Sequence, residues 1–134
     1  MTNFILKSCD PSKKLTVEKG TFLLREGTQS GFLYVLAEGS VDVLRGNVIV
    51  ASISEPGAVF GEMSMFLATA HTASVQTTSK CVVYAYEEGA AYLRSHPEIT
   101  YEIAALLAQR LNKATGYIVD LNDTVRSAGN IWAW

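Results

Sequence analysis

The chain has 134 residues, of which 49% are hydrophobic and 18% charged, and its formal net charge is −2. This length suits one domain, predicted over 1–134, and the composition is that of a folded chain. The net negative charge and the lack of a basic stripe argue against nucleic acid as a direct partner. No apolar run nears the roughly 20 residues that cross a bilayer. We therefore expect neither nucleic acid nor a membrane as partner.

The first residues lack the layout of a secretory signal. Two cysteines, Cys9 and Cys81, fit no metal-ligand spacing, and Cys81 lies in an apolar run. Reduced thiols, a cytoplasmic location and no metal site are expected.

Residues 15–86 form short runs rich in β-branched and aromatic residues, each followed by turn residues. The expected strands are 15–17, 21–25, 32–37, 40–45, 48–53, 73–77 and 81–86. Runs at this spacing predict an antiparallel sandwich or a jelly-roll-like barrel. Gly46-Asn47, between two alternating runs, predicts a two-residue hairpin.

The pattern becomes helical after Tyr86. A short helix is predicted to open at 87–89 and to run through Leu93. A second helix begins at Pro97, since proline is tolerated in a first turn, and is expected to continue to about Arg126. Gly116 is a weak point that costs about 1 kcal/mol relative to alanine. Residues 127–134 are expected to form a frayed tail.

The long predicted helix carries an apolar seam, whose members recur four and three residues apart. They are Leu107, Leu111, Ala114, Ile118, Leu121 and Val125. One small domain cannot cover a stripe of this length, so we predict a homodimer through Leu111, Ala114, Ile118, Leu121 and Val125. The alternative is a helix that folds back on its own barrel.

The residues of segment 57–75 follow one another in a sequence typical of an anion-binding site. Phe60-Gly61-Glu62 is followed by one short helical turn, and His71-Thr72 leads into the next strand. Backbone N–H groups at a helix start favour negative charge, and glycine at position 61 presents no side chain that would block an approaching ligand.

This segment resembles the phosphate-binding cassette of the cyclic-nucleotide-binding domain family, in which Phe-Gly-Glu is followed by Arg-Thr-Ala or Arg-Ser-Ala. Phe60-Gly61-Glu62 and Thr72-Ala73 match, and His71 stands at the arginine position. Glu26-Gly27, Glu38-Gly39 and Pro56-Gly57 resemble turns of the family in the family's order, so the resemblance covers about 15–125.

The resemblance implies a mainly β fold with C-terminal helices. Its body is a double-stranded β-helix, a jelly-roll-like β-roll over about 15–86, with a short cassette helix. The helices over about 87–126 would include a long dimerisation helix.

The resemblance also implies a role for each cassette residue. Glu62 would accept a hydrogen bond from the ribose hydroxyl, and Gly61, Glu62, Met63 and Ser64 would offer backbone N–H groups to the phosphate. Thr72 and, on the long helix, Thr115 would approach the base. From the residues alone, the alternative for Glu62 and Ser64 is that they only cap the helix, and Phe60 and Met63 are better read as core residues than as ligand contacts.

His71 leaves three readings open. Imidazole is shorter than arginine and mostly neutral near pH 7, and losing a charge-assisted hydrogen bond of ~1.5–3 kcal/mol weakens binding roughly 10- to 150-fold. His71 binds phosphate weakly and in a pH-dependent way, or the cassette has lost its nucleotide, or it serves another anion.

No catalytic constellation is present, so we expect neither an enzyme nor a cofactor. We expect no DNA-binding module like that of the family's transcription regulators after the long helix, so the resemblance implies a stand-alone sensor or assembly domain, or a fragment of a longer protein. The leading hypothesis is a regulatory sensor for cyclic AMP or cyclic GMP, coupled through its C-terminal helices to a downstream protein partner. The alternative is a degenerate domain that acts in protein–protein assembly.

Overall fold

The computed structural model describes residues 2–125. Within them lie eight strands: β1 (Lys14–Val17), β2 (Phe22–Leu24), β3 (Leu33–Glu38), β4 (Val41–Arg45), β5 (Val48–Ile53), β6 (Val59–Phe60), β7 (Ser74–Thr77) and β8 (Cys81–Tyr86). The helices are α1 (Thr2–Lys7), the 3-10 turn η1 (Pro11–Lys13), α2 (Glu62–Leu67), α3 (Gly89–Ser95) and α4 (Pro97–Val125). The predicted tail, 127–134, lies outside the described residues.

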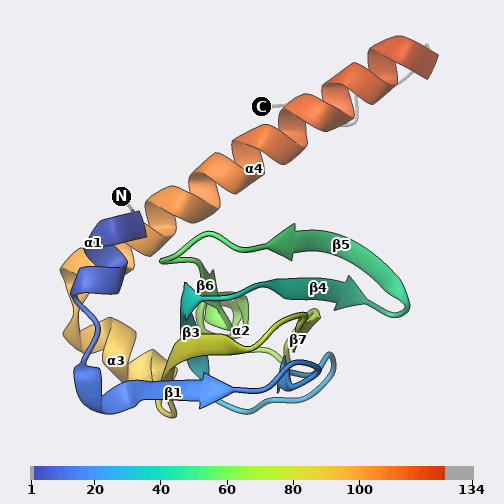
Figure 1. Cartoon of the computed structure of the whole chain (residues 1–134). Helices are drawn as coiled ribbons and strands as arrows, with labels where there is room; N and C mark the ends of the chain where they lie inside the picture. The colour runs from blue at the N-terminus through green and yellow to red at the C-terminus, as the bar shows by residue number, and fades with distance from the viewer. Residues whose placement is uncertain (1, 126–134) are drawn as a thin grey trace. The chain divides into compact units, whose positions relative to one another are not determined.

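The strands form two four-stranded antiparallel sheets (Figure 1), in the orders β1-β8-β3-β6 and β2-β7-β4-β5. Sequence neighbours are seldom partners, because the chain passes back and forth between the sheets. The exception is the β4–β5 hairpin, where Arg45 pairs with Val48 across the predicted Gly46-Asn47 turn. The predicted β-roll with a short cassette helix and a long C-terminal helix is confirmed.

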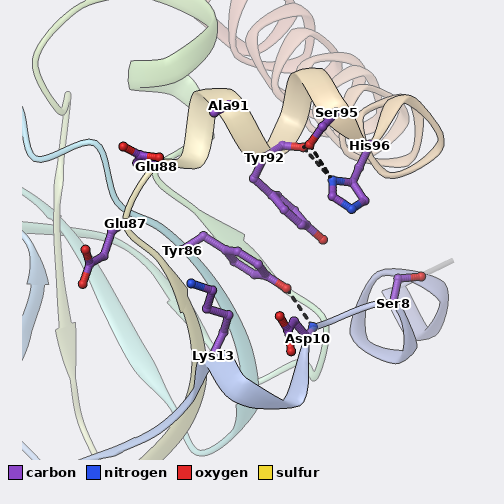
Figure 2. A pocket seen from close by; sticks show the side chains of 10 residues that line it. All are labelled: Ser8, Asp10, Lys13, Tyr86, Glu87, Glu88, Ala91, Tyr92, Ser95 and His96. Atoms are coloured by element: carbon purple, nitrogen blue, oxygen red, sulfur yellow. Dashed lines mark hydrogen bonds between the residues drawn. The ribbon is translucent and has the colours of Figure 1, made fainter.

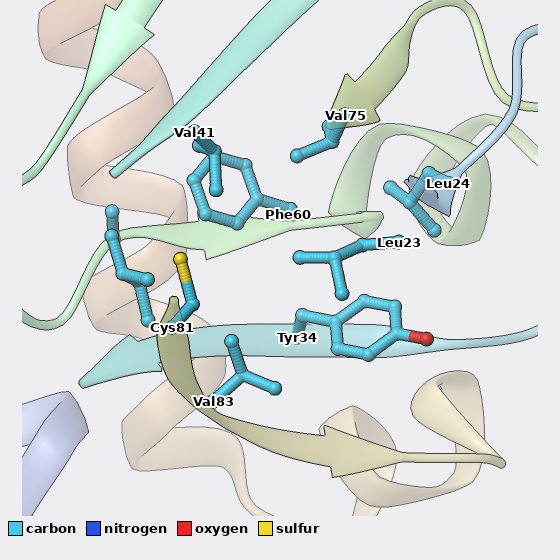
Figure 3. Close-up of a cluster of buried hydrophobic side chains, with 10 residues drawn as sticks. Leu23, Leu24, Tyr34, Val41, Phe60, Val75, Cys81 and Val83 are labelled. Atoms are coloured by element: carbon cyan, nitrogen blue, oxygen red, sulfur yellow. The ribbon is translucent and has the colours of Figure 1, made fainter. Parts of the chain in front are cut away.

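The core lies between the two sheets (Figure 3). Leu23, Val41 and Val75 come from one sheet, and Tyr34, Phe60, Cys81 and Val83 from the other. Full burial of one such aliphatic or aromatic side chain contributes about 1.5–3 kcal/mol. Both cysteines are free and buried, and burial raises the pKa of the Cys9 thiol to about 11.

One core prediction is wrong. The Met63 side chain is 43% exposed, because it projects from the outer face of α2, while the predicted core residue Phe60 is only 5% exposed.

The chain divides into two compact units, with the boundary between Thr100 and Tyr101. The first unit contains both sheets and the short helices, and the second contains most of α4. That helix continues without interruption through Gly116. Among the described residues, no helix combines the length and hydropathy that a membrane span requires.

Candidate functional site

The cassette begins at Gly61, between β6 and α2. Its φ is 97°, a left-handed value that glycine adopts without strain. A Cβ atom at this position would overlap the backbone carbonyl oxygen of Phe32. The space beside the Gly61 Cα is therefore filled by the backbone just before β3. This corrects the expectation that the missing side chain opens an approach for a ligand. Glycine is required here for packing.

Helix α2 places Glu62 and Ser64 on its buried face, at 5% and 6% exposure. Glu62 lies in the first turn, where the helix dipole favours a carboxylate. The Ser64 hydroxyl donates to the Thr69 carbonyl at 2.5 Å, and the Ser64 carbonyl accepts from the N–H of Ala68. The Ser64 side chain thus binds the residues that follow the C-terminal end of the helix. Because its hydroxyl proton is donated to Thr69, that proton is not available to a phosphate.

His71 is bound on three sides to the turn between β2 and β3. Its N–H donates to the Thr28 carbonyl at 2.8 Å, and its carbonyl accepts from the Gly27 N–H at 2.9 Å. Its Nε2 lies 2.7 Å from the Ser30 hydroxyl oxygen. The side chain is only 4% exposed. The imidazole therefore joins the cassette to the β2–β3 turn.

Burial also lowers the pKa of His71 below its usual range. The imidazole is then neutral at pH 7, and it gains less charge on acidification than an ordinary histidine does. This observation weighs against the first of the three readings, in which a protonated His71 grips phosphate.

Thr72 has a cationic neighbour that sequence reasoning missed. Strands β4 and β7 pair antiparallel with Leu44 opposite Ser74, so Arg45 lies beside the residues that precede β7. The Arg45 Nε donates to the Thr72 carbonyl at 2.9 Å. The two residues are 27 positions apart. They meet only because of the register between β4 and β7. This register cannot be predicted from the residue pattern of either strand alone.

The remaining predicted site residues lie on α4, in the second unit. Thr115 is half-buried, so its role at the base stays a prediction. Of the predicted seam, Leu111 and Leu121 are exposed at 61% and 46%, and Ala114 is also exposed. Ile118 is half-buried, and Val125 ends the helix.

The described residues hold a further cavity, of about 560 Å³, away from the cassette (Figure 2). It lies between the segment 8–13 and one face of α3. Sequence reasoning missed it, because residues that are neighbours here, such as Asp10 and Tyr86, are 76 positions apart. Among the described residues, no group of three or more histidine, cysteine or acidic side chains could hold a metal ion.

Comparison with curated proteins finds regulators. The chain is 27% identical over 109 residues to a CRP-like cAMP-activated global transcriptional regulator of Mycobacterium tuberculosis, covering 77% of this chain and 49% of that protein. It is 31% identical over 103 residues to a cyclic AMP receptor protein of Thermus thermophilus, covering 72% of this chain and 47% of that protein. The chain thus spans about half the length of these relatives.

Among solved structures, the catabolite activator protein of Thermus thermophilus superposes with a TM-score of 0.70 at 26% identity, over 90% of this chain and 58% of that one. The structure titled "Sp-2Cl-cAMPS bound to PKAR CBD2" has the same fold, with a TM-score of 0.60 at 18% identity over 85% and 84% of the two chains. The family model described as cyclic nucleotide-binding domain matches residues 14–92. The strands, the cassette helix and the first turn of α3 fall within this match. The chain belongs to the cyclic nucleotide-binding domain family.

Proposed function

We propose that this domain is a regulatory sensor that binds a cyclic nucleotide at the cassette around α2. The observation that carries the proposal is Glu62, a carboxylate held at 5% exposure in the first turn of α2, directly after Gly61. This is the position at which the family's glutamate accepts from the ribose hydroxyl. The curated relatives are named for cyclic AMP, which favours this ligand over cyclic GMP.

The cassette would hold the phosphate without a cationic fork from position 71. Backbone N–H groups of Gly61, Glu62, Met63 and Ser64 remain the donors, supported by the positive end of α2. Because the His71 imidazole is buried and its pKa is lowered, affinity would be lower than in a cassette with arginine there, and would rise less on acidification than with an ordinary histidine.

A signal from the cassette has a direct route to the C-terminal helices. Gly89, the first residue of α3, packs so closely on α2 that an added Cβ would lie 2.8 Å from the Met65 sulfur. Ligand binding that moves α2 would therefore move α3 as well, and α4 follows α3 after one intervening residue. A ligand shifts such an equilibrium only through contacts that differ between the two states.

The test is titration calorimetry with cyclic AMP and cyclic GMP on the wild-type protein and on Glu62→Gln. Removing the carboxylate charge keeps the shape of the side chain and should weaken binding roughly 10- to 150-fold, the cost of one charge-assisted hydrogen bond. The matched control is Glu38→Gln, an exposed position at the end of β3. The proposal is wrong if neither nucleotide binds at millimolar concentration, or if both variants lose the same affinity.

The second candidate function is protein–protein assembly by a domain that no longer binds a nucleotide. The observations that favour it are the structural use of His71 and the exposed apolar side chains of α4. Besides Leu111 and Leu121, these include Tyr117 and Val119, at 66% and 46% exposure. A failed nucleotide titration together with a stable dimer would support this function over the first.

A further inference from the structure

The cavity beside α3 is separate from the cassette. Helix α3 presents Gly89 and Leu93 toward α2, where Leu93 lines a small hollow together with Met65. Its other face, with Tyr92 and Ser95, lines the larger cavity. No residue from 61–72 reaches this space. Its volume of about 560 Å³ falls within the roughly 300–1,000 Å³ typical of small-molecule sites.

An aromatic column forms a firm wall of the cavity (Figure 2). The rings of Tyr86 and Tyr92 stack with centroids 3.9 Å apart, and His96 lies on the other side of Tyr92 at 4.3 Å. The Tyr86 hydroxyl oxygen accepts from the Asp10 N–H at 2.9 Å, which ties the N-terminal segment to β8. Burial raises the pKa of both phenols, so they stay neutral. The wall is therefore preformed.

The polar groups around the cavity are mainly hydrogen-bond acceptors. The His96 Nδ1 lies 2.9 Å from the Tyr92 carbonyl oxygen, which can only accept, and 3.0 Å from the Ser95 hydroxyl oxygen. In the tautomer in which Nδ1 donates to that carbonyl, Nε2 is an acceptor on the opposite edge of the ring. Asp10 stays ionised, because hydrogen bonds from Ser12 lower its pKa.

The charges agree with this excess of acceptors. Asp10, Glu87 and Glu88 contribute three carboxylates to the lining, and Lys13 contributes the single side-chain ammonium. The lining therefore carries two negative charges in excess. A ligand matched to it is positively charged, bears several N–H donors and has an apolar body that packs along the tyrosines.

We propose that this cavity binds a small organic polyamine cation. A metal ion is a poorer match, since no group of three or more metal-ligating side chains occurs among the described residues. An amine instead forms N–H bonds to dispersed acceptors, such as the Glu87 and Glu88 carboxylates, the Asp10 carboxylate and His96 Nε2. This site shares no residue with the cassette, so the polyamine proposal can be right or wrong whether or not a nucleotide binds.

The test is an NMR titration of the ¹⁵N-labelled full chain with spermidine at physiological salt. We expect saturable shifts at the amides of Asp10, Glu88 and Ser95, and no comparable shifts with the neutral 1,4-butanediol. The double variant Glu87→Gln/Glu88→Gln should weaken spermidine binding at least about tenfold through loss of charge-assisted bonds. Both positions are exposed, and the Glu88 side chain caps no N–H of α3, so the variant should keep its fold.

The matched control is Glu18→Gln/Glu38→Gln, which makes the same change of net charge at exposed positions outside the cavity. It should leave spermidine affinity within about twofold of wild type, because charges beyond the Debye length of ~8 Å are screened. Equal weakening by the two double variants would reveal diffuse attraction and overturn the proposal. So would shifts that do not saturate, or shifts spread away from the cavity.

Discussion

At position 71, the backbone and the side chain both bond to the turn between β2 and β3. The imidazole reaches Ser30 while it stays 4% exposed. An arginine side chain is longer and permanently charged, and burying it without a partner would cost several kcal/mol. Histidine therefore fits a position whose side chain joins two loops, and this use competes with contact to a ligand.

A pH dependence of stability follows from the buried imidazole. The pKa of His71 is lowered in the folded state, so below about pH 6.5 the unfolded chain binds more protons than the folded one. The stabilising contribution is complete above that pH and is lost as the pH falls. We expect wild type to lose more thermal stability than His71→Gln between pH 7.5 and 5.5, measured by circular dichroism melts. Parallel losses in the two proteins would contradict this origin.

The sequence alone identified His71 as the position that departs from the family pattern, but not what surrounds it. Ser30 is 41 residues away, and Arg45 meets Thr72 only through the pairing of β4 with β7. Composition and spacing report residue types along the chain. They do not report which loops meet at one end of a sheet.

At the scale of elements, secondary structure was predicted correctly where the alternation of apolar and polar residues extends over several residues. Alternating runs located all strands except β6, which pairs through only two residues, Phe60 and Val59. Helix α1 was also missed, although Ile5 within it is 1% exposed. A six-residue helix without an acidic first turn offers little local pattern, and its burial depends on tertiary contacts.

Helix α2 ends on a strained residue. Ala68 has φ of 53°, the one positive value at a non-glycine position among the described residues. A left-handed alanine costs the folded state roughly 1–2 kcal/mol. Glycine would remove this strain, but its more flexible unfolded chain lowers stability by about 0.4–1 kcal/mol. Ala68→Gly should therefore raise the free energy of unfolding by about 0.5–1 kcal/mol, measured by guanidinium denaturation.

The control for Ala68→Gly is Ala91→Gly, at an exposed position inside α3. There glycine replaces a helical alanine without relieving any strain, so stability should fall by about 1 kcal/mol. Destabilisation by both changes would show that the end of α2 is not strained in solution.

At the scale of the whole molecule, the first unit buries its apolar side chains between two sheets, whereas α4 leaves many of its own in contact with water. Leu111 and Tyr117 are more than 60% exposed. Several exposed apolar side chains on one helix commonly mark an interaction surface. The seam was visible in the sequence because it repeats along one helix. What covers the seam was not visible, because a single sequence does not record which surface packs against an exposed helix face.

The dimer prediction is tested at the middle of that seam. In a parallel or antiparallel pair, Ile118→Glu would place a carboxylate in an apolar contact, and an uncompensated buried charge of this kind raises the dimer dissociation constant at least about 100-fold. Light scattering coupled to size exclusion should then report a dimer for wild type and a monomer for the variant. Gln109→Glu makes the same charge change on an exposed position away from the seam and should stay dimeric. A wild-type monomer, or one mass for all three proteins, would show that α4 does not join two copies through this stripe.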